Sequence, residues 1–297
     1  MIIIFNPTAG PRRRALLTPV LARLKAIGAA VELRPTRGPR DAVRIARDLA
    51  PPADGLVVAA GGDGTLAEIA EGLLENPRGA EFRLGVIPLG TANVLAHEIG
   101  LSRDPDAIVA ALLDGEAQPL HAGRIGEGAT ARVFLMMAGA GFDAAVVAAV
   151  GSRLKRLCGR GAYILHTLRL ATTRRFPALD VRVDGVAMRA KSVVVCNGAH
   201  YGGPYRLAPN ANLRTPRFEV VLLDGAGGPG VALQGARLMR GTLHRAKGTR
   251  TISAREIEIL GCGPLQADGD IAAALPVRIA ASDAFLTLMT PRRGGRA

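Results

Sequence analysis

Three glycine-rich loops carry the residues whose types could do chemistry on a phosphate group. They read "NPTAG" (6–10), "GGDGT" (61–65) and "PLGTAN" (88–93), and each follows an apolar run and precedes a helical pattern. Glycine opens backbone amides to a ligand, and a helix N-terminus attracts anions. A carboxylate at Asp63 would repel phosphate directly, so its place in the second loop predicts a contact with Mg²⁺. For one such loop alone, an ordinary turn with Asp63 or Thr65 as a helix N-cap explains the pattern equally well.

The elements that would position these loops alternate between apolar runs and helical patterns. The expected strands lie at 2–5, 31–34, 55–60 and 84–88, and the expected helices lie at 12–27, 39–49, 64–75, 91–98 and 104–114. This alternation predicts a parallel sheet with helices on its faces. Because ligands bind beyond the carboxyl ends of parallel strands, we expect the three loops to meet at one sheet edge.

From about residue 118 the pattern changes to strand-like runs separated by short turns. These runs lie at 131–138, 179–184, 187–196, 217–223, 250–260, 275–280 and 284–289, with helical patterns near 143–174 and 229–243. We therefore expect an α/β domain at 1–117 and a mainly antiparallel, β-rich domain at 118–290. A basic tail at 291–297 completes the chain.

Composition narrows the classes of partner. The formal net charge of +13 favours anionic partners such as nucleotide phosphates or an anionic membrane. Aromatic residues make up only 3% of the chain and tryptophan is absent, which argues against a nucleic-acid binder that stacks bases. The three cysteines, Cys158, Cys196 and Cys262, form no CxxC pair. We therefore expect no disulfide framework or zinc site, and a reducing cytoplasm as the location.

One apolar stretch approaches the length of a membrane span. Residues 133–151 carry a single charge, Asp143, near their centre. A central Asp costs roughly 2.5–3.5 kcal/mol on an insertion scale, and glycines and alanines dilute the apolar character. We expect a buried strand, a turn and an apolar helix here. The chain's start, "MIIIF", has no basic region before its apolar residues and predicts a strand, not a signal peptide.

Other phosphate and metal motifs are absent or weak. No "GK" dipeptide occurs, so there is no Walker A lysine. The single GxGxxG, "GAGGPG" at 225–230, has no acidic residue about 20 positions later, so we interpret it as a loop. The five histidines show no metal spacing, and neither His97 nor His200 is assigned a role.

The three loops, in this order and spacing, resemble the diacylglycerol kinase catalytic-domain family, which includes soluble bacterial diacylglycerol kinases, YegS-like lipid kinases and sphingosine kinases. The resemblance continues through "GFDA" (141–144), "KRLCGRGAY" (155–163), "CNGAHYGGPYRLAPNA" (196–211) and "LQADGD" (265–270), and so spans nearly the whole chain. GGDGT alone is shared with NAD kinases and resembles a phosphofructokinase motif. The resemblance thus implies an NAD-kinase/phosphofructokinase-like first domain and a lipid-substrate second domain.

What the resemblance implies is an ATP-dependent lipid kinase whose nucleotide lies between two domains. By position in the motifs, the nucleotide site would comprise Asn6, Thr36, Gly61, Gly62, Asp63, Gly64, Thr65, Leu66, Ala67 and Thr91. The Mg²⁺ would arrive with ATP, and Asp63 would help to place it. The acceptor would be a hydroxyl of a diacylglycerol-like lipid.

The resemblance also assigns three carboxylates of the second domain. The family usually ends in "DGE", whose Glu is taken as the general base; here Asp270 stands at that position, one methylene shorter. Asp143 matches a family acid near the lipid site. Asp268 would orient the Asp270 loop or pair with a cation. The alternative for 268–270 is a plain hairpin turn, since Asp-Gly is a favoured turn pair.

Two departures from the family pattern concern an accessory Mg²⁺ network. Many relatives carry Asp after the Asn of "GTxN", where this chain has Val94, and "DDG" where this chain has Arg214, Thr215 and Pro216. Hard cations need oxygen ligands. We therefore expect that this accessory site is absent, and that the Mg²⁺ of ATP remains.

The region 144–179 contains seven basic residues and no acidic residue: Arg153, Lys155, Arg156, Arg160, Arg169, Arg174 and Arg175. It fits peripheral attachment to the inner face of the membrane, where each basic residue is worth about 1 kcal/mol, and it fits a solvated helix face equally well. The sequence leaves open a homodimer and the identity of the lipid.

Two other functions remain as alternatives. One is a catalytically weak, nucleotide-binding membrane or regulatory protein, because the cation network and the base differ from the family pattern. The other is an NAD kinase, although the Asn-Glu pair typical of that family does not occur.

Overall fold

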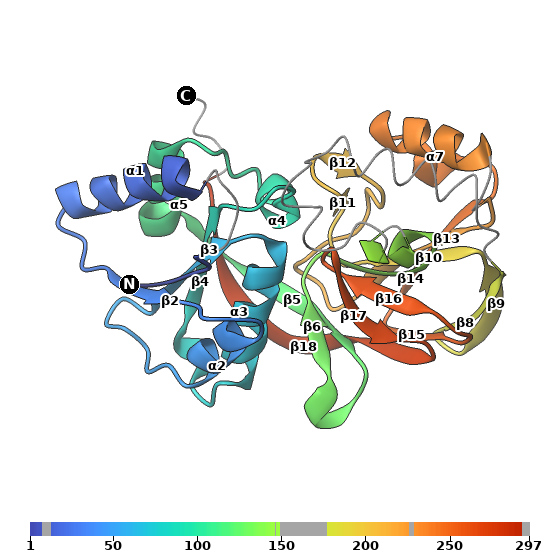
Figure 1. Cartoon of the computed structure of the whole chain (residues 1–297), viewed down its shortest axis with the longest axis horizontal. Helices are drawn as coiled ribbons and strands as arrows, with labels where there is room; N and C mark the ends of the chain where they lie inside the picture. The colour runs from blue at the N-terminus through green and yellow to red at the C-terminus, as the bar shows by residue number, and fades with distance from the viewer. Residues whose placement is uncertain (8–12, 146, 149–176, 226–228, 293–297) are drawn as a thin grey trace. The chain divides into compact units, whose positions relative to one another are not determined.

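The computed structural model describes the whole chain except residues 8–12, 146, 149–176, 226–228 and 293–297 (Figure 1). The chain divides into two compact units, Met1–His121 with Asp283–Ala297, and Ala122–Ser282. The basic region expected at 153–175, the motif at 155–163 and most of the helix expected at 143–174 lie outside the described residues.

The first unit is built on a parallel sheet, as expected. Its strands are β1 (Ile2–Phe5), β2 (Glu32–Pro35), β3 (Leu56–Gly61) and β4 (Arg83–Pro88). They are hydrogen-bonded in the order β2-β1-β3-β4, and every pairing is parallel. β3 is buried at every residue, which explains why it reads as a continuous apolar run rather than an alternation.

Helices precede or follow these strands along the chain. They are α1 (Arg13–Ala26), α2 (Asp41–Arg47), α3 (Asp63–Glu75), η1 (Gly79–Glu81), α4 (Val94–Glu98) and α5 (Pro105–Asp114). In α3 the buried residues Leu66, Ile69 and Leu73 follow the spacing of one helix face. α5 begins where Asp104 accepts a hydrogen bond from the Ala107 amide.

The second unit contains a six-stranded antiparallel sheet in the order β14-β13-β10-β7-β16-β17. Its strands are β7 (Met137–Gly141), β10 (Ser192–Cys196), β13 (Phe218–Leu223), β14 (Thr249–Ala254), β16 (Pro264–Ala267) and β17 (Asp270–Ala274). The other elements of this region are β5 (Glu116–Ile125), η2 (Gly128–Thr130), β6 (Arg132–Phe134), β8 (Leu179–Val183), β9 (Val186–Ala190), β11 (His200–Tyr201), β12 (Tyr205–Arg206), α7 (Pro229–Met239), η3 (Leu243–Arg245), β15 (Glu256–Ile259) and β18 (Val277–Thr290). The core includes Phe134 and Phe218, whose ring centroids lie 5.6 Å apart.

Three expected strands are in fact pairs of strands in different sheets. The run at 131–138 divides into β6, which pairs with β5, and the first part of β7, which pairs with β10 and β16. The run at 187–196 divides into β9, which pairs with β8, and β10, which pairs with β7 and β13. The run at 250–260 divides in the same way into β14 and β15. Only one or two residues separate the two strands of each pair. The strand-like pattern therefore continues across the corner, and the sequence does not reveal the change of sheet.

Other strands were not expected from the sequence, or were expected as separate pieces. The sequence predicts none of β5, β11, β12, β16 and β17, because β11 and β12 are two residues long and the other three lack a clear alternation. The runs at 275–280 and 284–289 form one strand, β18, which pairs with β15 through residues 277–280 and with β4 through Thr287 and Leu288. Residues 283–290 of this strand belong to the compact unit that also contains Met1–His121.

The apolar stretch at 133–151 forms β6, β7 and a helical segment at 142–145 and 147–148, as far as its residues are described. Among the described residues, no helix combines the length and apolar character that a membrane crossing requires.

Candidate functional site

The three loops of the first unit meet through backbone and side-chain hydrogen bonds. At the end of β1, the Asn6 side chain lies 3.5 Å from Thr65 Oγ1. At the end of β4, the amides of Leu89 and Gly90 donate to the Gly61 carbonyl at 2.9 and 3.2 Å. The expected meeting of the loops at the carboxyl ends of β1, β3 and β4 is thus seen in the structure.

Gly62 and Gly90 allow the second and third loops to touch. A Cβ atom built on Gly90 would lie 2.6 Å from the Cα of Gly62 and 2.7 Å from Asn93 Oδ1. Any larger residue at position 90 would force the loops apart. Close packing of backbone against backbone is therefore one reason for glycine here, in addition to access for a ligand.

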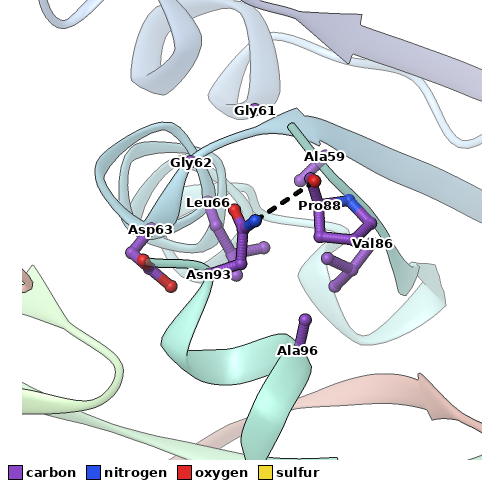
Figure 2. A pocket seen from close by; sticks show the side chains of 9 residues that line it. All are labelled: Ala59, Gly61, Gly62, Asp63, Leu66, Val86, Pro88, Asn93 and Ala96. Atoms are coloured by element: carbon purple, nitrogen blue, oxygen red, sulfur yellow. Dashed lines mark hydrogen bonds between the residues drawn. The ribbon is translucent and has the colours of Figure 1, made fainter. Parts of the chain in front are cut away.

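A small cavity lies between these loops (Figure 2). Its lining residues are Ala59, Gly61, Gly62, Asp63, Leu66, Val86, Pro88, Asn93 and Ala96. Figure 2 shows the Asn93 amide nitrogen turned toward the Pro88 carbonyl, 3.2 Å away. Asn93 Oδ1 is buried and has no donor among the described residues. A buried acceptor left unsatisfied costs about 1–3 kcal/mol, so this oxygen is a place where a ligand or water donor would be stabilising.

Asp63 contacts the helix that follows the third loop. Its Oδ1 accepts a hydrogen bond from the Leu95 amide at 3.3 Å, in the first turn of α4. Burial raises the pKa of the Asp63 carboxyl, and the amides of Leu95 and Val94 oppose that rise. Asp63 therefore provides a hydrogen-bond acceptor for a backbone amide in the first turn of α4. The sequence did not predict this contact.

The residues expected at the nucleotide site have different surroundings. Gly61, Gly62, Asp63 and Leu66 line the cavity. Thr36 is buried at the same sheet edge, where its amide donates to the Phe5 carbonyl at the end of β1. Ala67 is buried in α3, and Thr91 is exposed. Asn6, Gly64 and Thr65 are partly exposed at the same sheet edge. The sequence did not predict the lining residues Ala59, Val86 and Ala96, because their side chains carry no polar group.

In the second unit, Asp268 anchors a hairpin. β16 and β17 pair with Ala267 opposite Asp270, and Asp268 and Gly269 form the two-residue turn with φ of 46° and 88°. Positive φ at both positions is typical of the type I′ hairpin that Asp-Gly favours. The hairpin turn that the sequence also predicts for residues 268–270 is therefore present.

The Asp268 carboxylate accepts three backbone hydrogen bonds. The donors are the amides of Leu135, Met136 and Met137, at 2.7, 2.9 and 3.0 Å. The contact ties the turn to the chain segment between β6 and β7. These contacts are a structural basis for the expectation that Asp268 orients the Asp270 loop.

Asp270 and Asp143 differ in environment. Asp270 is the first residue of β17 and is exposed. Asp143 is 5% exposed and accepts hydrogen bonds from the Tyr201 hydroxyl and, at 2.7 Å, from Gln266 Nε2. Gln266 and Tyr201 lie within the motifs quoted above, but sequence reasoning gave them no role.

The positions of the expected accessory cation site carry no carboxylate. Val94 is buried at the start of α4, and Arg214 and Thr215 are exposed in a turn where Asn212 accepts from the Arg214 amide. Among the residues described, no group of three His, Cys, Asp or Glu side chains could hold a metal ion. Cys196 is buried and Cys262 is exposed. Cys158 lies outside the described residues.

Comparison with protein families matches both parts of the chain. Residues 1–125 match the model described as "Diacylglycerol kinase catalytic domain". Residues 136–290 match the model described as "YegS C-terminal NAD kinase beta sandwich-like domain". Together the two models cover most of the sequence.

Individual relatives agree with these models. The chain is 31% identical over 229 residues to a protein named "Diacylglycerol kinase" from Bacillus subtilis, covering 75% of this chain and 73% of the relative. It is 33% identical over 236 residues to a Pseudomonas aeruginosa protein named "Probable lipid kinase YegS-like", covering 76% and 75%. A crystal structure of a diacylglycerol kinase from Bacillus anthracis superposes with a TM-score of 0.72 over 97% of this chain and 96% of that one. At 21% identity, that likeness shows the fold.

Proposed function

Since the chain belongs to the diacylglycerol kinase family and is a lipid kinase, we propose that it transfers the γ-phosphate of MgATP to a hydroxyl of a diacylglycerol-like lipid. The observation that carries the proposal is the meeting of three glycine-bearing loops at one edge of the parallel sheet, with the thirteen-residue helix α3 beginning there. The first amides of a helix have no partner within it and suit a phosphate.

The residues of this edge fit a nucleotide phosphate. Asp63 would repel an anion, but its Oδ1 faces the Leu95 amide of α4. The unsatisfied Asn93 Oδ1 offers an acceptor to a bound group or its water. Magnesium bound to ATP would neutralise charge on the transferring phosphoryl group. Asp63 would help to place that ion, either directly or by holding α4 and the third loop.

In the proposed reaction the hydroxyl oxygen of the lipid forms a bond to the γ-phosphorus as the bond to the bridging oxygen of ADP breaks. Asp270 accepts the hydroxyl proton. Its exposure at the start of β17 leaves it accessible to a substrate. The Asp268 contacts fix the turn on which it stands, and such positioning is a main contribution to phosphoryl transfer.

We further propose that the protein works on an anionic membrane surface, supported by α7 and the chain after it. Between residues 225 and 255 there is no acidic residue. Within the part of the chain that the structure describes, no carboxylate pairs with the basic residues Arg237, Arg240, Arg245 and Lys247. Leu233 and Met239 of α7 are 52% and 63% exposed. Exposed apolar side chains beside basic ones are typical of helices that lie on anionic lipid.

A γ-phosphate transfer assay tests the function. Labelled ATP and Mg²⁺ are supplied with mixed micelles of diacylglycerol, monoacylglycerol, sphingosine, ceramide or polyprenol, and in parallel with NAD. We expect label in a diacylglycerol-like lipid, lost in Asp270→Asn and Asp63→Ala and kept in the exposed control Asp180→Asn. Label in NAD would instead establish an NAD kinase. ATP binding without transfer to any acceptor would favour the regulatory alternative.

A further inference from the structure

Asp143 and Gln266 form a buried polar pair beneath the hairpin that carries Asp270. Gln266 is 1% exposed and Asp143 is 5% exposed. Gln266 Nε2 donates to Asp143 Oδ2 at 2.7 Å, and Gln266 Oε1 accepts from the Gly269 amide at 2.9 Å. The Gln266 side chain therefore joins the Asp143 carboxylate to the turn between Asp268 and Asp270.

The chemistry of the partners determines the orientation of the Gln266 amide. A carboxylate can only accept, so it requires the nitrogen, and the Gly269 amide can only donate, so it requires the oxygen. A flipped amide would lose both bonds. The Tyr201 hydroxyl donates to the other oxygen of Asp143, which holds the carboxylate in place.

Gly139 makes room for the pair. It lies opposite Gln266 in the β7–β16 register. A Cβ atom at position 139 would collide with Asp143 Oδ2, and would lie 2.9 Å from Asp143 Cγ and 3.1 Å from Gln266 Nε2. The Asp143 side chain thus lies against the bare backbone of β7, beside the strand that leads into the hairpin.

We propose that Asp143 and Gln266 are positioning residues, which hold the turn so that Asp270 stands where it can take a proton, and that Asp143 acts through Gln266 rather than on the lipid. This rests on the proposed function. The expectation from the sequence placed Asp143 near the lipid site by resemblance alone; its burial and its bonds to Tyr201 and Gln266 assign it to the hairpin instead.

The test compares Asp143→Asn, Asp143→Ala and Gln266→Leu, with Gln118→Leu as the matched control. An Asn at 143 can still accept from Gln266 Nε2 and donate to the Tyr201 oxygen. Because charge-assisted hydrogen bonds are roughly twice as strong as neutral ones, we expect Asp143→Asn to lose about tenfold in kcat or less. Asp143→Ala and Gln266→Leu should lose about 100-fold, since a small misplacement of a reacting group has such an effect.

The loss should fall on kcat with little change in KM for the lipid, because the base and not the binding is disturbed. Asp143→Ala combined with Gln266→Leu should be no worse than either alone, since both break one linkage. The proposal would be overturned if Asp143→Asn were as inactive as Asp143→Ala while Gln266→Leu remained active. That result would indicate that the charge of Asp143 acts on the substrate and not through Gln266.

Amide hydrogen exchange of the peptide covering residues 264–274 gives a readout that needs no activity. We expect faster exchange at the Gly269 turn in Gln266→Leu and Asp143→Ala, a smaller increase in Asp143→Asn, and wild-type exchange in Gln118→Leu. Unchanged exchange in Gln266→Leu would overturn the positioning role. If the wild-type protein transferred no phosphate at all, the proposed function would fail, and this measurement would still decide the linkage.

Discussion

Asp268 and Asp270 stand two residues apart in one hairpin and have opposite environments. The Asp268 carboxylate accepts from three backbone amides at 2.7–3.0 Å, whereas Asp270 is exposed at the start of β17. The first carboxylate holds the turn, and the second is left accessible. Neighbouring acids of one motif thus have different surroundings.

The two acids should separate stability from activity. Asp268→Ala leaves three amides without their acceptor, so we expect it to lower the free energy of unfolding by about 1–3 kcal/mol and to reduce kcat as well. Asp270→Asn should change stability by no more than about 0.5 kcal/mol and reduce kcat by about 10²–10⁴-fold, the usual contribution of a general base. Urea unfolding and the micelle assay measure the two effects. An Asp270→Asn variant with full activity would contradict the assignment of the base.

Asp63 should make stability depend on pH in a particular direction. Burial raises its pKa in the folded protein above the unfolded value. A raised carboxyl pKa contributes stability at low pH that is lost as pH rises through the folded pKa. Asn does not titrate, so the stability of Asp63→Asn relative to the wild type should increase between pH 4 and pH 7.

Urea unfolding of both proteins at the two pH values checks this prediction, with the surface variant Asp180→Asn as control. Activity of Asp63→Asn should fall, since the proposed contact with MgATP needs the charge. A relative stability that decreases toward pH 7 would contradict the raised pKa.

Gly139 should not tolerate a methyl group. Gly139→Ala would drive Asp143 away from Gln266, and overpacking of this kind typically destabilises by about 1–3 kcal/mol. Gly235→Ala is the matched control, because a Cβ atom at position 235 would meet nothing within 4 Å and α7 gains a better helix former. We expect a lower melting temperature in the first variant and an unchanged or higher one in the second.

The exposed apolar residues of α7 should contribute to membrane binding. Leu233→Glu combined with Met239→Glu removes two side chains that could enter the bilayer interface, each worth about 1.5–3 kcal/mol when fully buried. We expect at least about tenfold weaker binding to vesicles of phosphatidylglycerol and phosphatidylcholine in a sedimentation assay.

Ile27→Glu, at an equally exposed apolar residue of the first unit, serves as the control and should bind as the wild type does. Binding should weaken with added salt, since basic residues supply part of the attraction. Equal binding by the α7 variant and the control would show that α7 does not contact the membrane.

The sequence by itself determined the local features of this protein. The continuous apolar runs of β1, β3 and β4, and the glycines after them, predicted a parallel sheet whose loops meet at one edge, and the structure confirms it. Strand and turn patterns depend on neighbouring residues, so they can be recognised in a sequence. The motif series also pointed to the family that the comparisons establish.

Tertiary structure decided the partners of the polar side chains. Gln266 bonds to Asp143 from 123 residues away, and Asp268 bonds to amides more than 130 residues before it. Strand β18 joins two expected runs because its far end pairs with β4. Such contacts depend on strand register and on which backbones approach closely, and no local pattern encodes them. The sequence therefore indicated the acids of the candidate site. Only the packed structure showed that Asp270 is exposed, that Asp143 is buried, and that Asp268 accepts backbone hydrogen bonds.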